Sequence, residues 1–201
     1  MFSYFCYKKK VIKPVILYYD STFFKTKLKH RDNTLCSAIW STFRFGEESM
    51  DRVIRWMEAH NLTENAAVLD TGNGMFLVEL AKHGNFYLSL CFTCDSQVAD
   101  FLNPSAELKG FDVCIDKGTF DAISLSPEDR EEAKKLYVNS LKTVMQPGGF
   151  SIITSCNWTK EQLLQIFRPG FELVRELPTP RFQFGGVMGN SVTALVFKKI
   201  D

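Results

Sequence analysis

The amino-acid sequence predicts an α/β fold built on a mostly parallel sheet. Three observations lead to this prediction. From residue 45 onward, short apolar runs alternate with segments of helical period, two of these runs end in an aspartate, and two further runs close the chain. Strands that alternate with helices are typical of parallel sheets whose faces are covered by helices.

Composition and charge point to a single globular domain that binds neither nucleic acid nor membranes. The 201 residues are 45% hydrophobic and 23% charged, and the formal net charge is +1. Such a balance gives no general attraction to polyanions. The apolar stretch 11–19 is interrupted by Lys13 and Pro14 and is too short to cross a bilayer. We expect a cytoplasmic protein, with the nucleus as an alternative location.

Six cysteines occur without the spacing of a disulfide framework or a metal site. Cys114 and Cys156 lie inside apolar runs, which predicts buried, reduced thiols. Cys91 and Cys94 form a lone C-x-x-C pair, which we interpret as two thiols at a strand end. We therefore expect no bound metal.

The first half of the chain is expected to contain an appendage, two helices and three strands. Residues 1–44 are rich in Phe, Tyr and Lys without a sustained period, which predicts a poorly packed amino-terminal appendage, so that the folded domain spans residues 45–201. The predicted helices are 50–60 and 76–83, and the predicted strands are 66–70, 86–92 and 111–116.

The second half shows clear signals for helix starts. Ser126 followed by Pro127 predicts the start of a helix that ends before Pro147. Thr159 and Gln162 form a capping box, which predicts a second helix ending at Phe167. The first helix should bury a stripe made of Ala133, Leu136, Tyr137, Leu141 and Val144. The predicted strands are 150–154, 171–177 and 192–198, with a glycine-rich connection over 183–190.

One glycine-containing turn is the best candidate for a cofactor site. Asp70, Gly72 and Gly74 follow the first predicted strand, where glycines let the backbone approach a ligand and the next helix offers free N–H groups. A carboxylate at the strand end would repel a pyrophosphate but suits a zwitterionic sulfonium compound, which favours S-adenosylmethionine over NAD. A tight turn that binds no ligand stays open as an alternative.

Two further groups of polar residues end strands at the same sheet edge. Asp116 and Lys117 follow the strand that begins at Phe111, and Asn157 and Trp158 follow the strand over 150–154. Ligands of α/β proteins bind at the carboxyl ends of such strands. Asn157 and Trp158 are suited to lining a channel for an amine, through a carbonyl oxygen and a cation–π contact. The alternatives are a turn with a surface ion pair and an aromatic lid on the core.

The order of several sequence blocks resembles a known family. These blocks are 45–49, 76–82, 100–103, 116–125, 155–159, 176–180, and 184–186 together with 189–191. They resemble the elongation factor 1-alpha lysine methyltransferases, a group of class I S-adenosylmethionine-dependent methyltransferases, over residues 45–200. The resemblance implies a Rossmann-like seven-strand fold with an antiparallel last strand, a monomer, and methylation of a lysine on translation elongation factor 1-alpha.

The resemblance also implies roles for individual residues. Asp70, Gly72 and Gly74 match the loop on the methionine side of the cofactor, and Asp100 matches the acid that contacts the adenine amino group. Asp116 with Lys117 matches the segment under the methyl donor. Asn157 with Trp158 matches the strand end that faces the substrate lysine.

The cofactor half of the chain is shorter than the family pattern. Only 30 residues separate Asp70 from Asp100, whereas one parallel βαβ unit already takes about 30. We therefore expect one strand and one helix to be missing. Asp95 is the only nearby substitute for the acid that holds the ribose, and the alternative is a loop carboxylate. Residues 1–44 also differ from the family's amino terminus.

Two other functions remain open. A defective variant of the family would keep substrate or partner binding without catalysis, as the short cofactor half suggests. A nicotinamide oxidoreductase would need a third glycine, but Met75 and Phe76 follow Gly74.

Overall fold

The structure is a computed structural model, and it describes the greater part of the carboxyl-terminal two thirds of the chain. Backbone and side chains are described for residues 48–62, 66–72, 76, 80, 101–124, 129–179 and 192–200. The backbone alone is described for the short strands at 6–7, 15–17, 97–99, 181–184 and 187–190.

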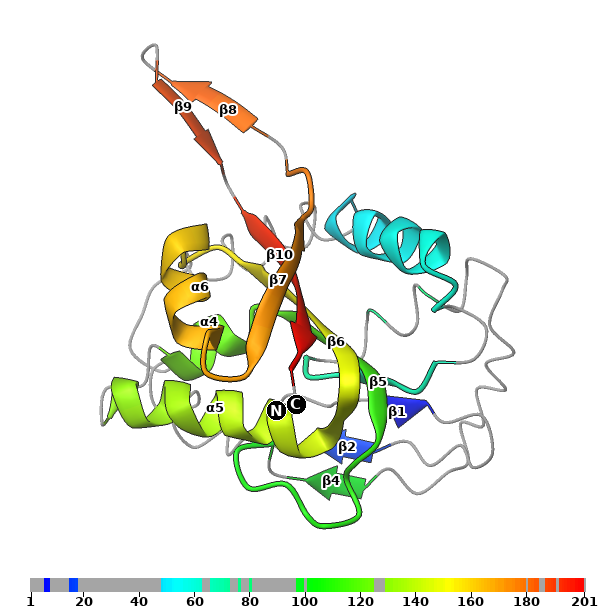
Figure 1. The fold of residues 1–201 in the computed structure, drawn as a ribbon. Helices are drawn as coiled ribbons and strands as arrows, with labels where there is room; N and C mark the ends of the chain where they lie inside the picture. Colours follow the sequence, from blue (N-terminus) through cyan, green and yellow to red (C-terminus); the bar gives the residue numbers. More distant parts are fainter. Residues whose placement is uncertain are drawn as a thin grey trace.

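A six-stranded sheet forms the centre of the fold (Figure 1), in the order β1-β3-β5-β6-β10-β7. Its strands are β1 (Cys6–Tyr7), β3 (Val68–Asp70), β5 (Phe111–Lys117), β6 (Met145–Ser155), β7 (Phe171–Glu176) and β10 (Thr193–Lys199). Strands β3, β5 and β6 are parallel, and β10 lies antiparallel between β6 and β7. The predicted α/β class and the antiparallel last strand are confirmed.

Two smaller sheets accompany the main one. β2 (Val15–Leu17) pairs in parallel with β4 (Gln97–Ala99), and β8 (Arg181–Phe184) pairs with β9 (Val187–Asn190) as an antiparallel hairpin. At the edge of the main sheet, β1 runs antiparallel to β3. The described parts of the predicted appendage are therefore two strands, β1 and β2, each paired with a later part of the chain.

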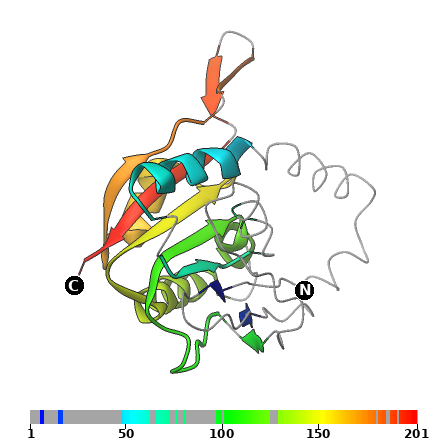
Figure 2. The same ribbon diagram turned by 90° about the vertical axis from the view of Figure 1, so that its right-hand side faces the viewer.

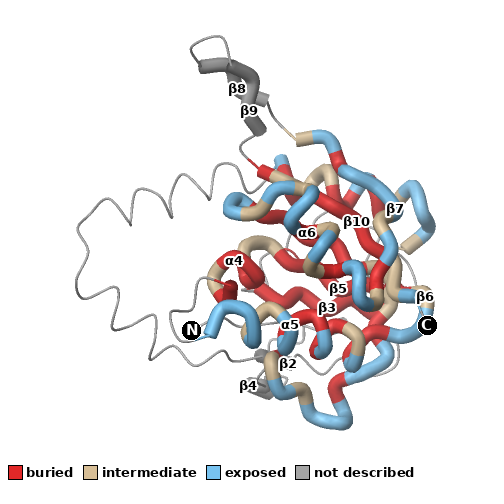
Figure 3. The backbone as a smooth tube through the Cα atoms, turned by 60° about the vertical axis from the view of Figure 1, so that its left-hand side comes forward, coloured by how far each residue is buried: buried red, intermediate tan, exposed pale blue. Residues whose placement is uncertain are grey.

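Helices cover both faces of the main sheet (Figures 1 and 2). The helix over residues 48–59 lies on one face, and α4 (Thr119–Ser124), α5 (Arg130–Val144) and α6 (Lys160–Phe167) lie on the other. Strand β10 shows the alternation that this arrangement requires, because Ala194 and Val196 join the core under the first helix, whereas Leu195 and Phe197 join the opposite core. Figure 3 shows that the buried residues concentrate on the central strands.

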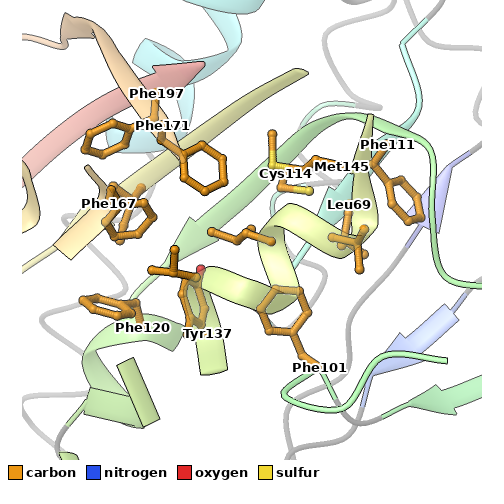
Figure 4. Close-up of a cluster of buried hydrophobic side chains, with 14 of the residues drawn as sticks. Leu69, Phe101, Phe111, Cys114, Phe120, Tyr137, Met145, Phe167, Phe171 and Phe197 are labelled. Carbon is orange, nitrogen blue, oxygen red and sulfur yellow. The ribbon is translucent and has the colours of Figure 1, made fainter. Parts of the chain in front are cut away.

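Aromatic rings fill the core between the sheet and helices α4 to α6 (Figure 4). Phe167 stacks on Phe197 with 4.8 Å between ring centroids, and the Tyr137 ring lies 4.9 Å from Phe120 and 5.2 Å from Phe101. These five side chains are almost completely buried. Tilted and offset ring pairs of this kind stabilise a core beyond their buried area.

Three local predictions were wrong. Helix α5 begins at Arg130, and its N-cap is Asp129, whose side chain accepts a hydrogen bond from the Glu132 amide. Leu136 is 39% exposed, and Val138 is buried in the stripe instead. Strand β6 begins at Met145 directly after α5, because the first residues after the helix already pair with β5.

Several predicted elements lie outside the described residues. Phe76 and Leu80 are helical and buried, which agrees with the predicted helix over 76–83, but the rest of that helix and the predicted strand over 86–92 are not described. The predicted loss of one strand and one helix falls on the same part of the chain. Within the described residues, no helix is long and apolar enough to cross a bilayer.

Candidate functional site

The carboxyl ends of three parallel strands meet at one edge of the sheet. Asp70 on β3 pairs with Ile115 on β5, and Lys117 on β5 pairs with Thr154 on β6. The segments that follow these strands are therefore neighbours. The Thr71 amide, just after β3, donates to the Ile115 carbonyl of β5 at 2.8 Å. This edge is where α/β folds bind ligands.

The loop after β3 is organised by the carboxylate of Asp70. One oxygen, Oδ1, accepts a hydrogen bond from the Gly72 amide at 2.7 Å, and Oδ2 accepts one from the Phe76 amide at 3.2 Å. Asp70 is 2% exposed, so both bonds form away from water. A Cβ atom added at Gly72 would lie 3.0 Å from Asp70 Oδ1. A side chain at residue 72 would therefore require the Asp70 carboxylate to move by a few tenths of an ångström, and its absence fits a loop that a cofactor approaches closely.

Asp116 at the end of β5 is the centre of a buried hydrogen-bond network. Its Oδ1 accepts from the Thr119 amide at 3.0 Å, and its Oδ2 accepts from the Phe120 amide at 2.9 Å. The hydroxyls of Thr71 and Tyr137 also donate to Oδ2, at 3.0 and 2.5 Å. Four internal donors thus converge on one carboxylate that is 2% exposed. Asp116 therefore stabilises the positions of the loop after β3 and the start of α4, because its oxygens accept hydrogen bonds from both.

Burial dominates the acid–base properties of this network. It raises the pKa of the Asp116 carboxyl from 3.8 to about 7, against the opposing effect of hydrogen bonds from Tyr137, Thr71 and Phe120. The nearby carboxylate of Asp121 adds to the increase. Burial and the negative charge of Asp116 likewise raise the pKa of the Tyr137 hydroxyl well above its usual range. The phenol therefore stays protonated and donates.

We expect the free energy of unfolding to fall as the pH rises from about 4 to about 7, because the pKa of Asp116 is about 7 in the folded chain. In this range the unfolded chain releases a proton that the folded chain still holds, so ionisation favours unfolding. The slope for one such group approaches about 1.4 kcal/mol per pH unit. Urea unfolding at several pH values measures it. Asp116→Asn should flatten the curve, and an unchanged slope in that variant would contradict the assignment.

Helix α4 makes hydrogen bonds both to the loop after β3 and to the end of β6. At its start, the Thr119 hydroxyl donates to the Thr71 carbonyl at 2.9 Å. Farther along, the Asp121 carboxylate accepts from the Ser155 hydroxyl at 2.5 Å and from the Cys156 amide at 2.8 Å. Burial raises the pKa of the Asp121 carboxyl, whereas the Ser155 hydrogen bond lowers it. One short helix thus fixes both loops that line the edge.

The loop after β6 contains the two residues predicted to face a substrate. The amides of Asn157 and Trp158 both donate to the Ser155 hydroxyl oxygen, at 3.1 and 3.0 Å. Asn157 is exposed. The Trp158 indole N–H donates to the Ser124 hydroxyl at 2.9 Å, and the Lys134 ammonium lies 5.1 Å from the centre of the indole ring. Trp158 is therefore anchored on α4 and half-buried, while Asn157 lies open at the edge.

Lys117 is a second half-buried group at this edge. Burial lowers the pKa of its ammonium, whereas the nearby Cys156 and Asp70 raise it. Cys156 itself is exposed, so the prediction of a buried thiol holds for Cys114 but was wrong for Cys156. The cause is its position, since residue 156 is the first one after the buried strand ends at Ser155.

The described structure brings six of the predicted site residues to one edge. They are Asp70, Gly72, Asp116, Lys117, Asn157 and Trp158. Gly74, Asp95 and Asp100 lie outside the described residues. The residues on either side of Asp100 are described. Strand β4 ends at Ala99, and Phe101 is 1% exposed in the core beside Tyr137.

Sequence reasoning missed the residues that hold this edge in shape. These are Thr71, Thr119, Asp121, Tyr137 and Ser155. One signal was available, since a carboxylate just before a helix can accept hydrogen bonds from its first free amides, and Asp116 binds the amides of Thr119 and Phe120 in that way. Among the described residues, no three His, Cys, Asp or Glu side chains lie together as metal ligands.

Solved structures share this fold at low sequence identity. Magnesium protoporphyrin IX methyltransferase (ChlM) from Synechocystis PCC 6803 with bound SAH superposes with a TM-score of 0.54 at 12% identity, over 90% of this chain and 95% of that chain. N-methyltransferase NodS from Bradyrhizobium japonicum WM9, in complex with S-adenosyl-L-homocysteine, gives 0.51 at 15% identity, over 78% and 88%. The fold is therefore that of the Rossmann-like methyltransferases.

Curated relatives narrow the class to one family. EEF1A lysine methyltransferase 2 from Danio rerio is 64% identical over 92% of this chain and 86% of its own length. The Homo sapiens protein of the same name is 54% identical over 78% and 75%. Protein-lysine N-methyltransferase efm4 from Schizosaccharomyces pombe is 31% identical over 77% and 82%. The chain belongs to the EEF1A lysine methyltransferase 2 family. No protein-family model matches the sequence.

The alignment with the Danio rerio relative also bears on the length of the chain. It runs over 205 residues but takes up 92% of a 201-residue chain, which is about 185 residues. About 20 positions of the alignment therefore have no counterpart in this chain. The loss of one strand and one helix stays a prediction. At most about 16 residues of the chain lie outside the alignment, so it includes part of residues 1–44.

Proposed function

We propose that this chain transfers a methyl group from S-adenosylmethionine to the ε-amine of a lysine on elongation factor 1-alpha. The observation that carries the proposal is the 64% identity, over 92% of the chain, to a protein named EEF1A lysine methyltransferase 2. The strand-end geometry supports it, because the loop of Asp70 and Gly72 and the loop of Asn157 share one edge.

The cofactor would lie against the loop after β3. When bound, S-adenosylmethionine supplies a methyl group that leaves a positively charged sulfur for an attacking amine. Gly72 lets the backbone approach the methionine part, and Asp70 keeps the loop in place through two amide hydrogen bonds. Gly74, two residues after Gly72 in the sequence, is proposed for the methionine part, and Asp100, the residue after β4, is proposed for the adenine amino group. Asp95 is proposed for the ribose hydroxyls.

The acceptor amine must arrive neutral and in line with the carbon–sulfur bond. The residues at the strand ends would therefore hold the lysine after its ammonium proton has passed to solvent, with its nitrogen aimed at the methyl carbon on the side opposite the sulfur. Residues at the ends of β5 and β6 would position the amine, with Asn157 offering an amide oxygen at the open edge. Such alignment lowers the barrier without a covalent intermediate.

We expect Asn157→Ala and Trp158→Phe to reduce turnover by roughly tenfold while the affinity for S-adenosylmethionine stays within about twofold. The reason is that both residues lie on the loop after β6, on the opposite side of β5 from the cofactor loop. Steady-state kinetics with elongation factor 1-alpha, together with calorimetry, separate the two quantities. Glu161→Ala, on the exposed start of α6, is the matched control. Equal losses in turnover and cofactor affinity would instead indicate that the two residues only maintain the core.

The second candidate function is partner binding without catalysis, which the short stretch of 30 residues from Asp70 to Asp100 favours. Titration calorimetry with S-adenosylmethionine and mass spectrometry of elongation factor 1-alpha after incubation distinguish the two. Micromolar cofactor binding and one added methyl group support the enzyme. Absence of heat with the cofactor, together with retained binding of the elongation factor, would contradict the enzyme and support the second candidate.

A further inference from the structure

The loop after β6 has a fixed backbone path. It consists of residues 156–159, between the end of β6 and the start of α6. Each of its four backbone amides donates a hydrogen bond to a side chain of the protein. A loop whose amides are all bonded in this way has little freedom to move. The four bonds run from Cys156 to Asp121, from Asn157 and Trp158 to Ser155, and from Thr159 to Gln162.

Ser155, the last residue of β6, accepts two of these four hydrogen bonds. Its hydroxyl oxygen lies 3.1 Å from the Asn157 amide and 3.0 Å from the Trp158 amide. A hydroxyl has two lone pairs and one proton, so both lone pairs are in use. The proton is donated to the Asp121 carboxylate, 2.5 Å away. All three hydrogen-bonding positions of the Ser155 hydroxyl are therefore occupied, and its orientation is set by its partners.

Asp121 holds the same loop from helix α4. Its two carboxylate oxygens bind separate donors, with Oδ1 accepting from the Ser155 hydroxyl and Oδ2 accepting from the Cys156 amide at 2.8 Å. Asp121 is 7% exposed and Ser155 is 1% exposed, so water competes little for these bonds. A carboxamide has only one acceptor oxygen, so with asparagine at this position one of the two donors would meet an N–H group. The two bonds together therefore require a carboxylate at residue 121.

The side chain of Trp158 joins the loop to α4 at a second point. Its indole N–H donates to the Ser124 hydroxyl at 2.9 Å, and its ring lies 5.8 Å from the Phe120 ring. Asp121 and Ser124 are three residues apart on α4, so one side of this helix reaches the loop through both residues. Asn157 lies exposed between the two anchors. Its position at the sheet edge consequently depends on the hydrogen bonds that the loop backbone makes.

We propose that Ser155, oriented by Asp121, is a positioning residue for the acceptor lysine. It determines where the loop of Asn157 and Trp158 meets the amine, and it thereby sets the rate of turnover. The inference rests on the proposed function, because the loop has an amine to position only if the chain methylates a lysine. The loop after β3 has its own hydrogen bonds to Asp70, so we expect the affinity for the cofactor to be independent of Ser155.

The test removes the hydroxyl and the carboxylate separately, in the full chain and well below the melting temperature of each variant. Ser155→Ala removes the acceptor of two loop amides, and Asp121→Asn places an N–H group against one of two donors. With elongation factor 1-alpha as the substrate, we expect each variant to lower kcat by about tenfold or more, because a misplacement of about 1 Å can cost about a hundredfold. The KM for the elongation factor and the affinity for S-adenosylmethionine should stay within about threefold.

Ser151→Ala is the matched control. It removes another buried hydroxyl from β6, four residues before Ser155 and therefore about 13 Å from the edge. We expect its kcat and its cofactor affinity to match those of the unmodified chain.

The double variant, Ser155→Ala with Asp121→Asn, tests whether the two residues act as one unit. Without the serine hydroxyl, the asparagine can turn its oxygen to the Cys156 amide and meets no second donor. We therefore expect kcat of the double variant to lie within about twofold of that of Ser155→Ala alone.

Three results would overturn the inference. One is an unchanged kcat in either single variant, and another is a double variant in which the two losses multiply. The third is a kcat that falls together with the affinity for S-adenosylmethionine, since the two residues would then only maintain the fold. Absence of methyl transfer by the unmodified chain is a different outcome, which would refute the proposed function and this inference with it.

Discussion

Asp116→Ala is expected to lower the free energy of unfolding by about 3–5 kcal/mol. The substitution leaves three donors without their acceptor, namely the amides of Thr119 and Phe120 and the hydroxyl of Tyr137. The Thr71 hydroxyl also loses Asp116 but keeps the Ile115 carbonyl as an acceptor at 3.1 Å. Each buried donor left unpaired costs about 1–3 kcal/mol, and the Tyr137 hydroxyl can recover part of this by rotating. The two amides cannot rotate, and they form the start of α4.

Thermal unfolding followed by circular dichroism measures the effect. For a chain of this length, 1 kcal/mol corresponds to a shift of about 2–4 °C, so we expect the melting temperature to fall by roughly 10 °C. Asp129→Ala is the matched control, because Asp129 also caps a helix but lies exposed at the start of α5. Losing that cap should cost about 1 kcal/mol. Equal shifts in the two variants would show that the buried network adds nothing to an ordinary cap.

Gly72→Ala should weaken binding of S-adenosylmethionine by about tenfold or more, which corresponds to about 1.4 kcal/mol. The added Cβ would lie 3.0 Å from Asp70 Oδ1. Asp70 cannot move aside without lengthening its hydrogen bonds to the amides of Gly72 and Phe76. The loop must therefore shift where the cofactor approaches. We expect the substitution to lower the affinity for the cofactor and to leave the stability of the core unchanged.

Calorimetry with the purified chain measures this change, and thermal unfolding without cofactor shows whether the fold is affected. Gly170→Ala serves as the control, because its Cβ would meet only the flexible end of the Lys142 side chain, far from the edge. We expect cofactor affinity in the control to match that of the unmodified chain. Retained affinity in Gly72→Ala would mean that the cofactor does not lie against this loop.

Local signals made much of the fold predictable. The capping box of Thr159 and Gln162 is present as predicted, because it depends on residues three positions apart. The central strands β3, β5, β6 and β10 were predictable from apolar runs, since helices cover both faces of the sheet and most residues in the apolar part of each strand are buried. The β8–β9 hairpin was also predictable, because two adjacent glycines, Gly185 and Gly186, between two apolar runs are typical of a tight turn. The prediction instead treated 183–190 as a connection between strands.

The arrangement beneath the site was not predictable in the same way. Tyr137 was predicted as a buried stripe residue, which is correct, but its hydroxyl bonds to a carboxylate 21 positions earlier in the chain. Ser155 and Asp121 meet across 34 positions. Such contacts depend on how helices pack on the sheet, and periodicity carries no information about them. For this reason the sequence identified residues of the candidate site better than it identified the residues whose hydrogen bonds fix the shape of that site.

Strand β1 has a consequence for how the chain behaves outside its native fold. It covers the outer side of β3, pairing Cys6 with Leu69 and Tyr7 with Val68. Among the described strands, β1 alone pairs with that side of β3, so without β1 the backbone amides and carbonyls there would form an open sheet edge next to buried apolar residues. Open apolar edges recruit strands from other molecules. A chain shortened to residues 45–201 should therefore self-associate more readily than the full chain, although it keeps every strand of the sheet from β3 to β10.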